Sequence, residues 1–162
     1  MTYSPRLLVS ACLCGIPCRY DATAAVVPEL AAMAAAGTAL PVCPELAGGL
    51  SAPRPPCEIR DGNGLTKTGR DVTDELTRGA EIVLALARQF GVTGAVLKQR
   101  SPSCGSKIIY DGTFSGRRIP GQGVTAALLG SHGIPVWSED DFPMNPEGDD
   151  SHEQGAVRKN DA

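Results

Sequence analysis

The hydrophobic pattern of the chain predicts short buried strands that alternate with helices. Apolar runs without polar interruptions are typical of strands that are buried on both faces of a parallel sheet. Such runs occupy about 6–10, 39–42, 95–97 and 134–137, and helices between them are predicted at about 28–37, 71–91 and 122–132. This alternation predicts an α/β fold with three layers, a Rossmann-like arrangement around a mostly parallel sheet.

The clearest helical pattern follows Asp71, a favourable N-cap residue, and ends before Gly91. Its apolar side chains recur at helical spacing. They form one stripe, made of Val72, Leu76, Ala80, Val83, Leu84, Ala87 and Phe90. This stripe predicts a helix that packs one face on the sheet and leaves the other in water.

Two other segments differ from the alternating pattern. Residues 44–70 are crowded with proline and glycine and show no periodicity. Loops of this length are uncommon in compact domains unless they are functional. We interpret the segment as a binding loop or lid, with a disordered insertion as the alternative. Farther along, an Asp-Gly pair within 108–114 predicts a small, tight hairpin.

Composition and charge indicate a single globular domain over residues 1–142, followed by a polar, loose tail at 143–162. Apolar residues make up 42% of the 162-residue chain and charged residues 20%, which does not favour a disordered or a membrane protein. The net charge of −3, the lack of a Lys/Arg run and the aromatic content of 4% do not favour nucleic-acid binding. No pattern specifies an oligomeric state.

The amino terminus is similar to a lipoprotein cleavage site at residues 9–12, but it lacks the apolar segment of a signal peptide. Roughly 7–15 apolar residues precede such a site. Here a serine, a proline and an arginine at residues 4–6 leave only three. We therefore expect a cytoplasmic protein whose six cysteines are reduced unless they hold a metal.

Three cysteines directly follow predicted strands, namely Cys12, Cys43 and Cys104. Because parallel strands end at one edge of the sheet, where α/β folds bind ligands, these thiols can converge on one site. Paired C-x-x-C motifs are absent and the two histidines, His132 and His152, come late, so the usual zinc signature is missing. Dispersed thiols on separate loops favour an iron–sulfur cluster. With three thiolates, one iron would keep an open position, a Lewis acid suited to a soft thiocarbonyl sulfur.

The alternative for any of these cysteines is a small buried hydrophobic residue. For Cys14, Cys18 and Cys57 the sequence favours neither interpretation. A redox role is not indicated, since no C-x-x-C pair occurs.

Other polar residues near the predicted strand ends are candidates for chemistry. Glu45 follows Cys43 closely and would deprotonate a water, or it would cap a helix. Ser101 and Ser103 would position a substrate or transfer a proton, or they would only form the turn. Arg19, Arg54 and Lys98 are candidates for binding a polar ligand, with solvated surface charge as the alternative. Gly48 and Gly49 are candidates for a close approach of the backbone to a ligand.

Three blocks of the sequence resemble the signatures of the thiouracil desulfidase family, a family of small bacterial domains. The blocks are Ser10-Ala11-Cys12-Leu13-x-Gly15-x-x-Cys18-Arg19-Tyr20-Asp21, then Pro41-Val42-Cys43-Pro44-Glu45-x-x-Gly48-Gly49-Leu50-x-x-Pro53-Arg54, then Leu97-Lys98-x-x-Ser101-Pro102-Ser103-Cys104-Gly105. Residues 69–73 also resemble a family block, and the resemblance covers about 6–142.

The resemblance implies a [4Fe-4S] enzyme that removes sulfur from thiolated uracil without net redox chemistry. Carried over by position, Cys12, Cys43 and Cys104 would hold the cluster. Glu45 and Ser101 would be the acid–base residues, and Ser103, Gly48, Gly49, Arg19 and Lys98 are the expected substrate-binding residues.

The expected reaction converts 2-thiouracil, 4-thiouracil or a thiolated uridine nucleotide to its oxo form plus sulfide. Glu45 would activate the attacking water, and Ser101 would donate a hydrogen bond or relay a proton as the C–S bond breaks. Cys14 stands where the family usually has leucine, so it is the alternative to Cys12 as a ligand. An iron–sulfur or sulfur carrier without turnover and a zinc-stabilised structural domain are the competing functions.

Overall fold

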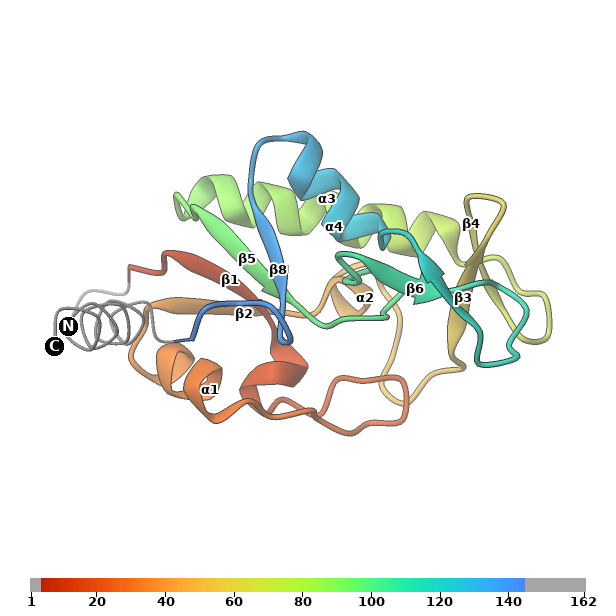
Figure 1. Cartoon of the computed structure of the whole chain (residues 1–162), viewed down its shortest axis with the longest axis horizontal. Coiled ribbons are helices and arrows are strands. Elements are labelled where there is room, and N and C mark those ends of the chain that lie inside the picture. The colour runs from red at the N-terminus through yellow and green to blue at the C-terminus, as the bar shows by residue number, and fades with distance from the viewer. Residues whose placement is uncertain (1–3, 145–162) are drawn as a thin grey trace, which may run out of the picture.

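A parallel sheet of four strands organises residues 4–144, the part of the chain that the computed structural model describes (Figure 1). The strands are β1 (Leu7–Ser10), β2 (Ala39–Val42), β5 (Gly94–Leu97) and β8 (Val136–Ser138), in the order β2-β1-β5-β8. Every neighbouring pair is parallel. The chain leaves β1 for β2 on one side and crosses to β5 on the other, and such a reversal of direction is where open α/β sheets bind ligands.

Helices cover both faces of the sheet and complete three layers (Figure 1). One face carries α1 (Pro28–Ala35), and the other carries α3 (Thr73–Gln89) and α4 (Val124–Ser131). Because successive residues of a strand point to opposite faces, Leu8 packs into the core under α3 and α4, and Val9 into the core beside α1. The predicted three-layer α/β architecture is confirmed.

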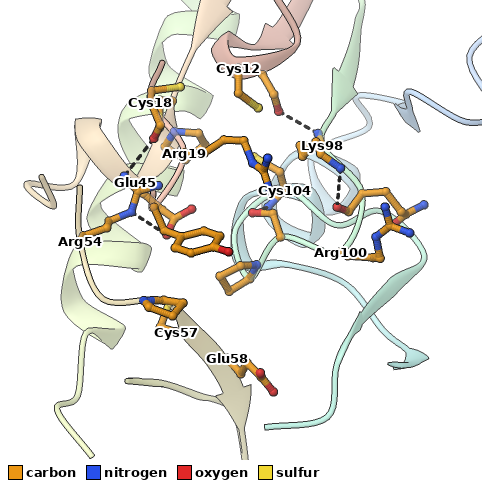
Figure 2. A pocket seen from close by; sticks show the side chains of 18 of the residues that line it. Cys12, Cys18, Arg19, Glu45, Arg54, Cys57, Glu58, Lys98, Arg100 and Cys104 are labelled. Carbon is orange, nitrogen blue, oxygen red and sulfur yellow. Dashed lines mark hydrogen bonds and ion pairs between the residues drawn. The ribbon is translucent and has the colours of Figure 1, made fainter. Parts of the chain in front are cut away.

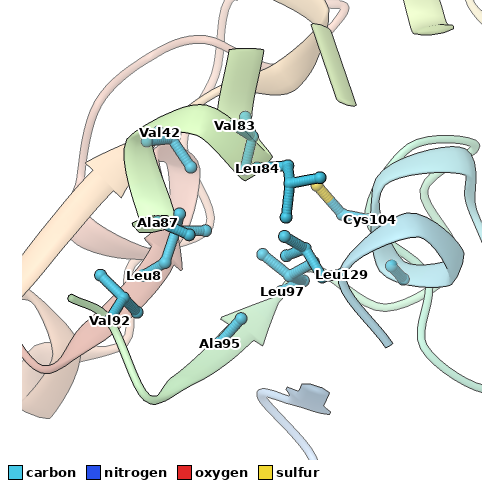
Figure 3. Close-up of a cluster of buried hydrophobic side chains, with 11 residues drawn as sticks. Leu8, Val42, Val83, Leu84, Ala87, Val92, Ala95, Leu97, Cys104 and Leu129 are labelled. Carbon is cyan, nitrogen blue, oxygen red and sulfur yellow. The ribbon is translucent and has the colours of Figure 1, made fainter. Parts of the chain in front are cut away.

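The core on the α3 side of the sheet combines apolar residues from three strands and two helices (Figure 3). The predicted stripe of α3 supplies Val83, Leu84 and Ala87 to it. Phe90, the last residue of that stripe, is instead 41% exposed because it lies just past the end of the helix. The core consists of Leu8, Val42, Val83, Leu84, Ala87, Val92, Ala95, Leu97, Cys104, Ala126 and Leu129.

The start of α3 differs slightly from the prediction. The helix begins at Thr73, with Val72 at the N-cap position, rather than directly after Asp71. Asp71 Oδ1 nevertheless accepts a hydrogen bond from the Thr73 N–H at 2.8 Å. The carboxylate therefore satisfies a free donor of the first turn, which is the role that the sequence suggested.

Residues 44–70 contain three short elements where the sequence predicted a loop without secondary structure. They are α2 (Pro44–Ala47), β3 (Cys57–Arg60) and β4 (Asn63–Thr66), and the two strands form an antiparallel hairpin. Each element spans four residues, too few to show a hydrophobic period. The hairpin is held by a small core of Cys57, Val72 and Leu76. The segment therefore has secondary structure, and the alternative of a disordered insertion is wrong. The interpretation as a binding loop agrees with Glu45, Arg54 and Cys57, which line the cavity described below.

The hairpin predicted at 108–114 exists, but its turn is longer. β6 (Ile108–Tyr110) pairs with β7 (Arg118–Pro120), which leaves residues 111–117 as the connecting loop. Asp111 Oδ1 accepts hydrogen bonds from the Thr113 N–H and hydroxyl at 2.9 and 2.6 Å. The aspartate thus folds back on its own loop instead of forming a two-residue reversal.

No helix within residues 4–144 is long and apolar enough to cross a membrane. The division into a domain at 1–142 and a tail at 143–162 stays a prediction, because residues 145–162 lie outside the described part of the chain.

The short helix α2 lies so close to α3 that glycine is required at the contact. A Cβ on Gly48 would lie 1.8 Å from the Glu75 carbonyl oxygen, and a Cβ on Gly79 would lie 1.9 Å from the Pro44 carbonyl oxygen. This crossing fixes the position of α2 and hence of Glu45 in its first turn.

We expect Gly48→Ala to lower the free energy of unfolding by roughly 1–3 kcal/mol, because backbone atoms must move to admit the methyl group. Urea denaturation followed by circular dichroism measures the change. Gly130→Ala is the matched control, since nothing lies within 4 Å of a Cβ at that helical position. Alanine there should be neutral or stabilising by up to about 1 kcal/mol. Equal effects of the two substitutions would contradict the close crossing.

Candidate functional site

A cavity of about 420 Å³ lies at the carboxyl ends of β1, β2 and β5 (Figure 2). Its volume falls within roughly 300–1,000 Å³, the range of small-molecule sites. Residues that follow the three strands build one side, and the hairpins β3–β4 and β6–β7 contribute to the other. The cysteines in its lining are Cys12, Cys18, Cys43, Cys57 and Cys104.

The three cysteines that follow the strands all reach this cavity, as the sequence predicted. Cys12 belongs to η1 (Ala11–Cys14), the 3-10 turn directly after β1. Cys43 is the single residue between the end of β2 and the start of α2. Cys104 is 5% exposed and also contacts the core under α3 (Figure 3). Distant parts of the sequence thus supply thiols to one site.

Burial and neighbouring thiols control the protonation of these groups. Burial raises the pKa of the Cys104 thiol to about 12. Hydrogen bonding with Cys18, followed by burial, raises the pKa of the Cys43 thiol. Both are therefore protonated at neutral pH. Since metal ligands are thiolates, metal binding at this site would release protons.

Cys18 is a fourth thiol beside the predicted ones, and the sequence did not assign it a role. It is 3% exposed, and a hydrogen bond with the Cys12 thiol raises its pKa to about 11. The Cys43 thiol donates to the Cys18 carbonyl at 3.8 Å. Cys18 therefore lies between two predicted ligands.

The two cysteines of η1, Cys12 and Cys14, lie in different surroundings. Cys12 lines the cavity, whereas Cys14 does not. The Cys14 thiol points toward α1 and donates to the Leu30 carbonyl at 3.8 Å. Of the two, only Cys12 lines the cavity, so the geometry favours Cys12 over Cys14 as the predicted ligand.

Glu45 is held at the cavity by Arg54 (Figure 2). Arg54 Nε lies 3.3 Å from Glu45 Oε1, with side-chain exposures of 5% and 14%. Arg54 Nη1 also donates to the carbonyls of Cys18 and Ser51, each at 2.9 Å. A planar guanidinium with several fixed partners orients a carboxylate more firmly than a lysine would. Arg54 therefore fixes the direction in which Glu45 faces.

Ser101 lines the cavity. Its Oγ accepts hydrogen bonds from the backbone N–H groups of Ser103 at 3.1 Å and Cys104 at 3.0 Å. An oxygen that already accepts twice is a better donor through its own proton. The same hydroxyl lies beside the Cys104 thiol, where its hydrogen bond opposes the rise in that pKa.

Basic side chains outnumber acidic ones around the cavity. Of the predicted binding residues, Arg19 and Lys98 are in the lining, and Lys98 Nζ is 2.8 Å from Glu139 Oε2. Arg100, to which no sequence pattern assigned a role, also lines it. The carboxylates of the lining are those of Glu45 and Glu58. The excess of positive charge suits a site that holds thiolates and an electron-rich substrate.

Three predicted substrate-binding residues lie away from the cavity lining. Ser103 is fully buried, and its carbonyl accepts the N–H groups of Thr125 and Ala126 at the start of α4. Gly48 packs on the Glu75 carbonyl, as described above, and Gly49 lines a separate cavity of about 140 Å³. Their substrate-binding roles stay predictions. A short spacing from Cys104 or Cys43 in the sequence does not ensure that a side chain or backbone faces the same cavity as the thiol.

The donor set fits a metal cluster better than a single ion. A tetrahedral zinc needs its donors around one point, whereas an iron–sulfur cluster is held by thiolates at separate irons. Thiols that line one cavity from three loops match the second requirement.

Comparisons with known proteins agree with this site. A family model described as 2-thiouracil desulfurase matches residues 7–141. The chain belongs to this family. Its structure is similar to that of the [4Fe-4S]-dependent thiouracil desulfidase TudS, with a TM-score of 0.82 and 50% sequence identity, over 86% of this chain and 93% of that chain. The uncharacterized protein YbbK of Bacillus subtilis (strain 168) is 44% identical over 146 residues, which are 84% of this chain and 97% of YbbK.

Membership of the 2-thiouracil desulfurase family confirms the resemblance seen in the sequence blocks. The match to the TudS structure likewise confirms the α/β fold. The roles of the individual cysteines, of Glu45 and of Ser101 are proposals that follow from the geometry.

Proposed function

We propose that this protein is a [4Fe-4S]-dependent thiouracil desulfidase. It exchanges the sulfur of a thiolated uracil for the oxygen of water, giving the oxo base and hydrogen sulfide with no net oxidation or reduction. The observation that carries the proposal is that Cys12, Cys43 and Cys104 reach one cavity from the ends of three neighbouring strands, together with Glu45 and Ser101. The family match and the similarity to a [4Fe-4S]-dependent desulfidase support it.

Cys12, Cys43 and Cys104 would hold the cluster. When bound through three protein thiolates, a [4Fe-4S] cluster supplies one iron with an open position, which acts as a Lewis acid toward a thiocarbonyl sulfur. Arg19 and Arg54, which line the same cavity, offset part of the negative charge that three thiolates bring.

Glu45 is the general base of the proposed reaction. It accepts a proton from a water that attacks the ring carbon bearing sulfur. Arg54 holds the carboxylate at the cavity through the 3.3 Å contact, so that no rearrangement is needed before proton transfer. Burial of this pair keeps bulk water from competing for the carboxylate.

Ser101 is the proposed donor. Because two backbone N–H groups already occupy its lone pairs, its hydroxyl acts as a donor, either to the Cys104 sulfur or to a heteroatom of the substrate. It thereby stabilises charge that develops when the C–S bond breaks and relays a proton toward the departing sulfur.

The substrate is a thiolated uracil, either 2-thiouracil, 4-thiouracil or a thiolated uridine nucleotide. The cavity of about 420 Å³ is large enough for a small planar ring in addition to a cofactor. Action on free small molecules rather than on nucleic acid, and a cytoplasmic location, are further parts of the proposal. They are supported by the net charge of −3 and by the six free cysteines.

Anaerobic reconstitution with iron and sulfide tests the function. We expect about four irons per chain. The loaded protein should convert 2-thiouracil, 4-thiouracil or the nucleotide 4-thiouridine monophosphate to the oxo form, which chromatography detects. One sulfide should be released for each product formed. A carrier would instead transfer its cluster to an acceptor protein without forming product, and a zinc domain would be colourless. A cluster-loaded protein that desulfurises none of the three compounds would contradict the proposal.

A further inference from the structure

The hairpin β6–β7 gives the cavity an aromatic side that the proposed mechanism does not use. Tyr110, Phe114 and Gly116 of this hairpin line the cavity. The chain has few aromatic residues, at 4%. Of those within residues 4–144, half line this one cavity: Tyr20, Tyr110 and Phe114 do, and Phe90, Trp137 and Phe142 do not.

Phe114 is placed as a binding residue rather than as a core residue. It belongs to none of the three apolar cores of the described residues. Its backbone has φ +57°, a left-handed conformation that bulky side chains rarely adopt. Such strain persists only where surrounding contacts enforce it, and it is concentrated at functional sites.

The loop that carries Phe114 is hydrogen-bonded to β3. Glu58 Oε1 accepts hydrogen bonds from the backbone N–H groups of Gly112 at 3.0 Å and Phe114 at 3.2 Å. Gly112 lies so close to β3 that a Cβ there would be 2.7 Å from the Ile59 carbonyl oxygen. One carboxylate oxygen therefore attaches the loop 111–117 to a neighbouring hairpin.

We propose that Phe114 stacks on the pyrimidine ring of the substrate and selects flat heterocycles, and that Glu58 is the positioning residue that holds Phe114 in place. This inference rests on the proposed function and names how its ring is recognised. A planar ring gains affinity by stacking on an aromatic face whatever its substituents are. The Phe114 ring would therefore bind 2-thio and 4-thio rings alike, and also the oxo product.

Amide hydrogen exchange tests the role of Glu58 without substrate. In Glu58→Ala, the amides of Gly112 and Phe114 should exchange faster, because both lose their acceptor. Glu58→Gln should restore protection, since an amide oxygen accepts as well. Glu81→Ala is the matched control, an exposed glutamate in the middle of α3. Unchanged exchange in Glu58→Ala would overturn the positioning role.

Steady-state kinetics and product binding with the iron-loaded protein test the role of Phe114. Phe114→Ala should raise KM for 2-thiouracil and the Kd for uracil by roughly 5- to 150-fold, the value of one base–aromatic stack. The kcat should stay close to that of the unmodified chain, and Phe114→Tyr should behave like the unmodified chain. Glu58→Ala should raise KM similarly, with no further rise when it is combined with Phe114→Ala.

Two results would overturn the inference. One is an unchanged KM and uracil Kd in Phe114→Ala, and the other is a loss of kcat in Glu58→Gln, which would make this carboxylate part of the chemistry. Uracil binding, measured by calorimetry, does not depend on turnover. A protein that binds uracil through Phe114 but releases no sulfide would therefore contradict the proposed function. It would still support the stacking role of Phe114.

Discussion

Cys12→Ser is expected to abolish both cluster binding and turnover, whereas Cys14→Ser is expected to leave both nearly unchanged. Cys12 lines the cavity, whereas the Cys14 thiol lies outside the lining and donates a hydrogen bond to the Leu30 carbonyl of α1. Serine is a poor ligand for iron in place of a thiolate. The loss of cluster affinity should exceed the roughly 10–100-fold that changes outside the ligand shell produce. Iron content, acid-labile sulfide and visible absorbance measure it.

The pair is informative because both cysteines lie in the same four-residue turn, η1. Serine replaces a thiol by a hydroxyl of similar size in each case, so a general loss of folding would affect both variants, and circular dichroism would detect it. Iron retained in Cys12→Ser but lost in Cys14→Ser would show that the turn presents the other thiol. Iron retained in both would remove this turn from the metal site.

Glu45→Gln is expected to reduce kcat on the order of 10²- to 10⁴-fold, the contribution of a general base. Iron content and the absorbance of the cluster should stay unchanged, because Glu45 is not a proposed ligand. Glutamine keeps the size of the side chain and can still contact Arg54, so the change removes the basic oxygen with little disturbance of the 3.3 Å pair. Sulfide release under saturating substrate measures the effect.

The chain itself offers a matched control for this prediction. Glu29 stands in the sequence Pro-Glu-Leu-Ala at the start of α1, and Glu45 stands in the same four residues at the start of α2. Glu29 is exposed and lies outside the cavity lining. Glu29→Gln should therefore leave kcat unchanged. Full activity in Glu45→Gln would show that another group or a free hydroxide activates the water.

The strands and their cysteines were predictable from sequence because buried parallel strands leave uninterrupted apolar runs. The run at 39–42 coincides with β2, and the run at 95–97 lies within β5. Polar residues that follow such runs must lie at the edge of the sheet, so the convergence of Cys12, Cys43 and Cys104 follows from topology alone. This part of the site could be predicted from the local hydrophobic pattern and from the rule that parallel strands end at the same edge of the sheet.

The other side of the cavity could not be predicted in this way. Glu58 and Phe114 meet through hydrogen bonds between residues far apart in sequence, and the hairpins that carry them are too short to show periodicity. Adjacency was also misleading for Ser103. It lies next to Cys104, yet the turn directs it under α4, whereas Ser101 faces the cavity. Side-chain direction in loops is set by tertiary packing.

The order of the strands has a consequence for how the enzyme matures. Cys12 and Cys43 follow the first two strands of the chain, but Cys104 becomes available only after β5 has been synthesised and inserted beside β1. A nascent chain on the ribosome therefore holds only part of the proposed ligand set until the centre of the sheet has formed. On this proposal, cofactor delivery follows folding, and a cluster bound by these three cysteines would link β2, β1 and β5 and oppose their local opening.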